Sequence, residues 1–233
     1  MTQHSAIVTG SASGIGAAAA RRLTDAGWRV IGVDRAPGAD VTGDAADPAI
    51  LHEAMRRLRG PLHGLVCSAG VPPSGPWDDL GHWDEVLRVN LKAAYCAFRE
   101  LLPALAAADG ASVVFIGSVV GAGEGSLRSP AYAAAKAGLE GLARSLALIG
   151  AADDIRVNVV AAGAIDTAFD EKLAPADDRP DVPLGRMGTP DEVASVCMYL
   201  LEPDAAYVTG AVWRVDGGRT ALSTVDARRL RGG

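Results

Sequence analysis

Short apolar runs recur along the chain, each bounded by glycine or polar residues and followed by a longer, helix-like stretch. The runs are rich in Val and Ile and do not alternate with polar residues, a pattern typical of parallel strands buried on both faces. Regular alternation of strand and helix predicts an α/β fold with a doubly wound parallel sheet in three α/β/α layers. The expected strands are residues 6–9, 30–33, 64–68, 112–117, 155–161 and 211–215, and the expected helices are residues 15–26, 50–58, 83–105, 130–149 and 190–200.

No low-complexity linker or internal repeat divides the chain, so one domain is expected over residues 1–233. The least regular segment, residues 164–189, contains several Pro, Asp and Gly residues. A long connection inside a compact domain often covers a binding site, and we therefore expect a lid. A surface loop without a function is the alternative.

Composition excludes several classes of partner. The chain has 22 basic and 28 acidic residues, a net charge of -6, which disfavours nucleic acid or an anionic membrane surface. No apolar run reaches the roughly 18 residues that a membrane-spanning helix needs. The three cysteines are far apart and the four histidines lack ligand spacing, so we expect no disulfide framework and no metal site. Such cysteine usage fits the reducing cytoplasm.

A glycine-rich turn, Thr-Gly-Ser-Ala-Ser-Gly-Ile-Gly at residues 9–16, separates the first expected strand from the first expected helix. Glycines permit a tight turn and let a phosphate approach the backbone, while the start of a helix offers free N–H groups. A purely structural turn is the alternative. The position between strand and helix favours a dinucleotide-binding turn at Gly10, Gly14 and Gly16.

An acidic residue, Asp34, ends the second expected strand. In a Rossmann-like fold this is the position of the carboxylate that binds the adenosine ribose. A carboxylate there accepts hydrogen bonds from the 2′-hydroxyl of NAD and repels the 2′-phosphate of NADP. NAD is therefore the expected cofactor. NADP remains the alternative, because Arg35 follows directly and can turn toward a phosphate.

Tyr132 and Lys136 are four residues apart in a segment of strong helix formers, which places both side chains on one face of a helix. A free tyrosine has a pKa of about 10, and a nearby ammonium group lowers that pKa. Such a pair can pass a proton to or from an alcohol oxygen. Taken alone, the same spacing also occurs by chance on solvated helices.

Together these motifs resemble the short-chain dehydrogenase/reductase family from Ala6 to about Thr220. The glycine-rich turn is similar to the family's cofactor turn, and Tyr132 and Lys136 are similar to its active-site pair. Ser118 ends the fourth expected strand, and Asn90 lies in an Arg-Val-Asn-Leu segment. Val-Asp-Gly-Gly at residues 215–218 resembles the family's C-terminal signature. Motifs that occur together and in order are more specific than any one of them.

The resemblance implies a role for each matching position. Tyr132 would be the acid in reduction and the base in oxidation, and Lys136 would lower its pKa and bind the nicotinamide ribose. Ser118 would hold the substrate oxygen, and Asn90 would order a proton relay through water. The implied cofactor-binding residues are Gly10, Ser13, Gly14, Ile15, Gly16, Asp34, Arg35, Asp44, Ala45, Ser68, Ala69, Gly70, Tyr132, Lys136, Gly163, Ile165 and Thr167.

The chain departs from the family's pattern in three places. The usual Pro-Gly after the fifth strand is Ala-Gly at residues 162–163, and the usual Asn-Asn before Ala-Gly is replaced by Cys67 and Ser68. Only ten residues separate Asp34 from Asp44, where many relatives have a full helix. One crossover is therefore expected to be a short loop that leaves the adenine side more open.

The predicted function is an NAD-dependent oxidoreductase that interconverts a secondary alcohol and a ketone by hydride transfer. The alternatives are a dihydrodiol-type dehydrogenase, a 3-oxoacyl-carrier-protein reductase and a catalytically silent NAD-binding sensor. The expected partners are a small alcohol or ketone and further copies of the chain, because relatives pair into tetramers through the helices at residues 83–105 and 130–149. No nucleic acid or membrane partner is expected.

Overall fold

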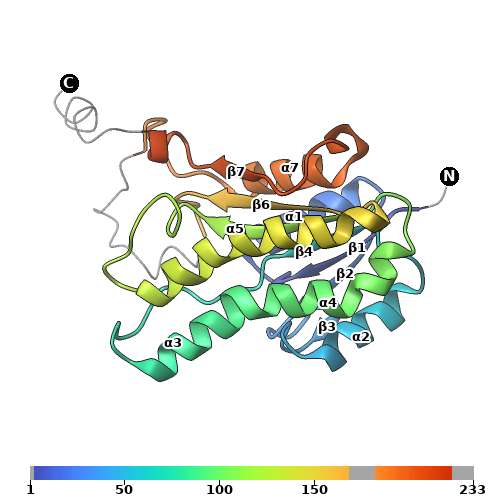
Figure 1. Ribbon diagram of the computed structural model, residues 1–233, viewed down its shortest axis with the longest axis horizontal. Coiled ribbons are helices and arrows are strands. Elements are labelled where there is room, and N and C mark those ends of the chain that lie inside the picture. The colour runs from blue at the N-terminus through green and yellow to red at the C-terminus, as the bar shows by residue number, and fades with distance from the viewer. Residues whose placement is uncertain (1–2, 168–181, 222–233) are drawn as a thin grey trace.

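The sheet is entirely parallel in the computed structural model, which describes residues 3–167 and 182–221 (Figure 1). Its strand order among the described residues is β3-β2-β1-β4-β5-β6-β7. The strands β2 and β3 extend the sheet on one side of β1, and β4 to β7 extend it on the other side. The loops that follow the strands diverge where the strand order reverses, and this opens a crevice at the carboxyl ends of the strands. The strands are β1 (Ser5–Thr9), β2 (Arg29–Asp34), β3 (Val41–Thr42), β4 (Gly64–Cys67), β5 (Ser112–Ser118), β6 (Arg156–Ala162) and β7 (Val212–Val215).

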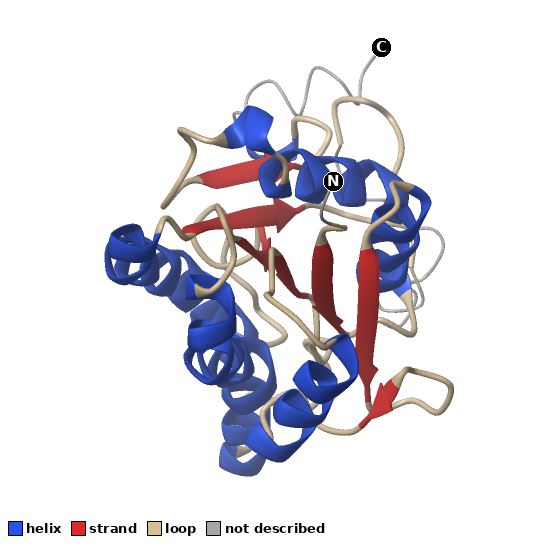
Figure 2. Ribbon diagram, turned by 90° about the vertical axis from the view of Figure 1, so that its right-hand side faces the viewer, coloured by secondary structure: helices blue, strands red, loops and turns tan. Residues whose placement is uncertain are grey.

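Helices cover both faces of the sheet, and in Figure 2 the strands lie between the two helical layers. One layer holds α1 (Gly14–Asp25) and α7 (Pro190–Leu201), and the other holds α2 (Pro48–Leu58), α4 (Ala93–Ala106) and α5 (Pro130–Gly150). A further helix, α3 (Leu80–Leu87), continues through a π-helical turn (Arg88–Lys92) into α4. Single 3-10 turns are Ala151–Asp153, Pro203–Ala205 and Arg219–Ala221.

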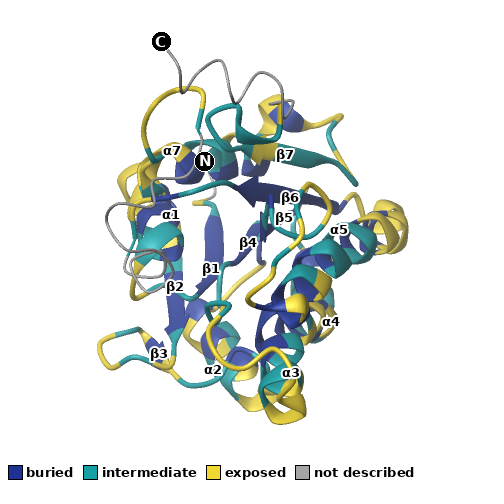
Figure 3. Ribbon diagram, turned by 90° about the vertical axis from the view of Figure 1, so that its left-hand side faces the viewer, coloured by how far each residue is buried: buried dark blue, intermediate teal, exposed yellow. Residues whose placement is uncertain are grey.

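The core has two parts because successive side chains of each strand point to opposite faces. Ile7 packs in the cluster beneath α2, α4 and α5, whereas Val8 packs in the cluster beneath α1 and α7. Both residues are fully buried. Figure 3 shows the same division, with buried strands in the middle and exposed residues on the outer faces of the helices.

The predicted fold class is confirmed, and the element ends differ from the expected ones mostly by one or two residues. The short strand β3 was not expected, since two residues carry no readable pattern. The expected helix at 83–105 begins at Leu80 and is interrupted by the π-helical turn. The predicted short crossover is confirmed, because six residues, 35–40, join β2 to β3.

The predicted lid lies partly outside the described residues, since positions 168–181 are not among them. The described residues at its two ends are joined by backbone hydrogen bonds. The Asp166 N–H donates to the Gly188 oxygen at 2.8 Å, and the Gly188 N–H donates to the Ala164 oxygen at 3.0 Å. Among the helices of the described ranges, none has the length and apolar character needed to cross a bilayer.

Candidate functional site

A cleft of about 1100 Å³ opens at the carboxyl ends of the strands. Loops from both halves of the sheet line it, as the topology of a doubly wound fold requires. Two predicted site residues, Gly16 and Asn90, do not line it. The predicted residues that do are Gly10, Ser13, Gly14, Ile15, Asp34, Arg35, Asp44, Ala45, Ser68, Ala69, Gly70, Ser118, Tyr132, Lys136, Gly163, Ile165 and Thr167.

The glycine-rich turn presents bare backbone to this cleft. Gly10 has a φ of +70°, and a Cβ there would lie 2.7 Å from the Ala69 nitrogen. Gly16 packs behind the turn, where a Cβ would lie 2.0 Å from the Gly10 oxygen. Ser13 caps α1 without a side-chain hydrogen bond. The start of α1 therefore faces the cleft with the positive end of its dipole, and an anionic diphosphate fits this cradle.

Asp34 joins the end of β2 to the glycine-rich turn. One carboxylate oxygen accepts a hydrogen bond from the Ala12 N–H and the other accepts one from the Ala36 N–H, both at 2.9 Å. These two bonds fix the orientation of the carboxylate. Each oxygen keeps a further lone pair that can accept a hydrogen bond from a ribose hydroxyl.

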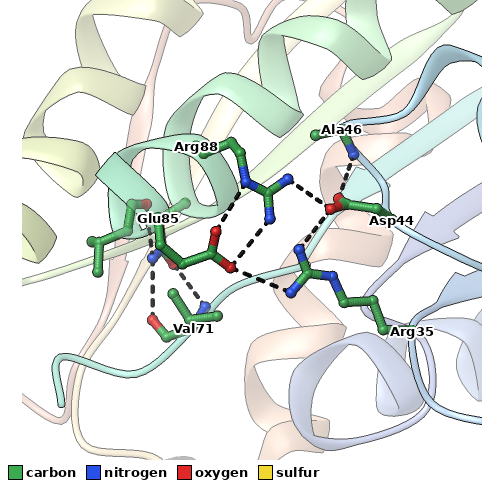
Figure 4. A network of polar contacts seen from close by, with 8 residues as sticks. Arg35, Asp44, Ala46, Val71, Glu85 and Arg88 are labelled. Carbon is green, nitrogen blue, oxygen red and sulfur yellow. Dashed lines mark hydrogen bonds and ion pairs between the residues drawn. The ribbon is translucent and has the colours of Figure 1, made fainter. Parts of the chain in front are cut away.

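Beside Asp34, an ion-pair network joins the β2–β3 loop to α3 (Figure 4). One oxygen of Asp44 accepts hydrogen bonds from Arg35 and Arg88, each at 2.6 Å, and its other oxygen accepts one from the Ala46 N–H at 2.9 Å. Burial acts to raise the pKa of Asp44, but the Ala46 N–H and the two guanidinium groups together lower it to about 2. Sequence reasoning missed Glu85 and Arg88, although acid and base three residues apart on a helix are a readable signal.

The side chains of Tyr132 and Lys136 lie together at the first turns of α5. Ser129 caps this helix and its hydroxyl oxygen accepts a hydrogen bond from the Tyr132 N–H at 3.2 Å. The Lys136 ammonium donates to the Ile116 oxygen at 2.8 Å and lies 5.5 Å from the centroid of the Tyr132 ring. Burial lowers the pKa of Lys136 to about 8. A cation is thus held beside a buried phenol.

Ser118 lies at the carboxyl end of β5. It pairs in register with Ala162 on β6, and its hydroxyl oxygen accepts a hydrogen bond from the Val120 N–H at 3.1 Å. The hydroxyl proton remains available for another acceptor. Ser118, Tyr132 and Lys136 all line the cleft, so a substrate oxygen in the cleft can meet the hydroxyl groups of Ser118 and Tyr132.

Asn90 lies behind the wall of the cleft, in the π-helical turn. Its amide nitrogen donates to the Val71 oxygen at 3.1 Å and to the Val86 oxygen at 3.2 Å, and its amide oxygen accepts from the Val71 N–H at 3.2 Å. These bonds hold the backbone that follows β4 against the helix. A proton relay through Asn90 remains a prediction.

The lining of the cleft also includes an ion pair that sequence reasoning missed. Both carboxylate oxygens of Glu124 accept from the guanidinium of Arg219, at 2.8 and 2.6 Å. Asp216 supports the turn that carries Arg219, since it accepts hydrogen bonds from the Thr220 N–H and hydroxyl. The partners are 95 residues apart, so no local pattern links them.

The chain is similar in sequence to known oxidoreductases. A family model described as enoyl-(acyl carrier protein) reductase matches residues 36–220. The cis-4-hydroxycyclohexanecarboxylate dehydrogenase of Sinomonas cyclohexanicum is 37% identical over 243 residues, which cover 93% of this chain and 96% of that relative. The chain belongs to the short-chain dehydrogenase/reductase family. The predicted resemblance is confirmed.

Solved structures of similar proteins show the same fold with bound nicotinamide cofactors. The 3-alpha-hydroxysteroid dehydrogenase of a Pseudomonas species, complexed with NADH, is 32% identical with a TM-score of 0.81 and covers 98% of this chain and 99% of its own. A Beutenbergia cavernae structure with NADP at low occupancy is also 32% identical, with a TM-score of 0.86 and coverages of 95% and 98%. This short-chain dehydrogenase/reductase is therefore an oxidoreductase of CH–OH groups with a nicotinamide cofactor.

Proposed function

We propose that the protein interconverts a secondary alcohol and a ketone with NAD(H) as cofactor. The observation that carries the proposal is that Ser118, Tyr132 and Lys136 line one cleft, which the bare glycine-rich turn and Asp34 also line. Neither half of this arrangement alone would specify the reaction. Together they support a reaction in which a proton-transfer pair acts beside a bound dinucleotide.

The bound nicotinamide ring would supply or accept the hydride, and the chain would manage the accompanying proton. In reduction, the Tyr132 hydroxyl donates a proton to the ketone oxygen as the alcohol forms. The Ser118 hydroxyl donates a hydrogen bond to the same oxygen and holds it in place. The Lys136 ammonium stabilises the phenolate that Tyr132 becomes, because opposite charges favour the ionised form of a buried acid.

NAD is the proposed cofactor because of the charges beside the cleft. The Asp34 carboxylate can accept hydrogen bonds from ribose hydroxyls but repels a 2′-phosphate. Arg35, the cation that follows it, forms ion pairs with Asp44 and Glu85. Its positive charge is thus already balanced by carboxylates.

A substrate screen tests the proposal directly. The purified protein would be mixed with NADH or NADPH and ketones of several classes, including a 4-oxocyclohexanecarboxylate, a 3-oxosteroid and a 3-oxoacyl thioester, and the absorbance of the reduced cofactor would be followed. We expect turnover with at least one ketone and faster turnover with NADH. Binding of NADH without turnover of any ketone would instead favour a silent cofactor-binding protein.

We also propose a homotetramer that functions in the cytoplasm. The helices α4 and α5 carry exposed apolar side chains, among them Tyr95, Leu148 and Ile149, which a neighbouring copy of the chain would cover. Light scattering should give about four times the chain mass of 23.8 kDa. A mass near that of one chain would contradict the assembly.

A further inference from the structure

Arg35 is the group at this site that can neutralise a 2′-phosphate, because it directly follows the ribose-binding acid of the proposed function. The structure pairs its guanidinium with two other carboxylates. One nitrogen donates to Asp44 at 2.6 Å and another donates to Glu85 at 3.4 Å (Figure 4). Two carboxylates therefore already bind Arg35.

Arg88 competes with Arg35 for the same acceptors. Arg35 and Arg88 bind the same oxygen of Asp44, and they also share one oxygen of Glu85, at 3.4 and 3.1 Å. Removal of Arg88 would leave both carboxylates to Arg35 alone. Removal of the Glu85 charge would leave Arg35 with Asp44, an acceptor that it still shares with Arg88.

The charges of the network add up to a small negative value at the ribose end. Two guanidinium groups balance the carboxylates of Asp44 and Glu85, and Asp34 adds one more negative charge. A 2′-phosphate in this region would be repelled by the negative charge of Asp34, while Arg35 and Arg88 are already paired with carboxylates. The short loop at residues 35–40 places Arg35 within reach of α3, where Glu85 lies.

We propose that Glu85 is a positioning residue that excludes NADP by holding Arg35 away from the 2′-phosphate. The inference rests on the proposed cofactor site and extends it to a residue on α3, 50 positions after Arg35 in the sequence. It predicts effects of opposite sign for two neighbouring charges. Loss of Glu85 releases Arg35 toward a phosphate, whereas loss of Arg88 holds Arg35 more firmly.

The test compares two nucleotide fragments that differ by the 2′-phosphate, adenosine 5′-monophosphate and adenosine 2′,5′-bisphosphate, by calorimetry on the full chain. Glu85→Gln should shift the preference toward the bisphosphate by about two- to fivefold, the effect of one exposed ion pair. Arg88→Met should shift it away by a similar factor. Turnover with NADP relative to NAD should change in the same directions.

Two controls separate positioning from a general structural effect. Glu53→Gln breaks an exposed pair with Arg56 and Arg57 on α2 and should leave the preference unchanged. When Arg35 is first replaced by Met, the further change Glu85→Gln should not alter the preference between the monophosphate and the bisphosphate.

Provided that the monophosphate still binds, two results would overturn the inference. One is a preference for the bisphosphate that changes in the same direction in Glu85→Gln and Arg88→Met, and the other is a preference that does not change in Glu85→Gln. Tighter binding of the bisphosphate than of the monophosphate by the wild type would also overturn it. Failure of both fragments to bind the wild type would overturn the proposed cofactor site as well.

Discussion

The buried ammonium of Lys136 should make the stability of the protein depend on pH in the alkaline range. Its pKa falls from 10.5 in the unfolded chain to about 8 in the folded one because of burial. Between these values the unfolded chain binds a proton that the folded chain lacks, so the unfolding free energy rises with pH across this window. At roughly 1.4 kcal/mol per pH unit, the rise amounts to about 3 kcal/mol.

Lys136→Met removes the titrating group and retains an unbranched apolar side chain. Urea unfolding is measured without nucleotide at pH 7.5 and pH 10.5, and both proteins also carry Tyr132→Phe, because the ionisation of that phenol depends on Lys136. Between the two pH values, the unfolding free energy of the protein with Lys136 should rise by about 3 kcal/mol relative to that of the protein with Lys136→Met. The exposed Lys92 is the matched control, and Lys92→Met should show no such gain. A difference that stays constant within about 1 kcal/mol would refute the assignment of a desolvated lysine.

Three further predictions follow from the packing. Gly16→Ala should weaken NADH binding in calorimetry by more than about tenfold, because the new Cβ would lie 2.0 Å from the Gly10 oxygen, whereas Gly141→Ala on α5 should not. His63 has a pKa lowered by burial and by His4, so the folded state resists its protonation. The wild type should therefore lose stability to urea as the pH falls below about 6.5, and His63→Gln should lose less. Arg156 donates to the Leu200 and Glu202 oxygens at the end of α7, and Arg156→Met should lower the unfolding free energy by about 2 kcal/mol; an unchanged urea midpoint would contradict this.

The sheet and most helices could be predicted from the sequence because each is specified by a local pattern. Continuous apolar runs identified β1, β2, β4, β5, β6 and β7, and helix formers identified α5 with Tyr132 and Lys136 on one face. The glycine-rich turn and Asp34 were predicted for the same reason, since the turn chemistry is local. The structure places both on the cleft, apart from Gly16, which supports the turn from behind.

What the sequence did not reveal depends on contacts between distant segments. The apolar pattern runs through the π-helical turn without a break, so residues 88–92 read as ordinary α-helix. The Asp44–Arg88 and Glu124–Arg219 pairs bring together residues 44 and 95 positions apart. The hydrogen bonds of Asn90 likewise depend on Val71, which reaches it only after the sheet has formed.

The central claim is that Tyr132 transfers the proton in a nicotinamide-dependent reduction. The most direct measurement is kcat/KM for NADH and the best ketone of the screen, in wild type, Tyr132→Phe and the control Tyr207→Phe, whose side chain is fully exposed. The account predicts a loss of about 10²- to 10⁴-fold for Tyr132→Phe, the usual contribution of a positioned acid, and wild-type activity for the control. A loss of less than about tenfold in Tyr132→Phe would contradict it.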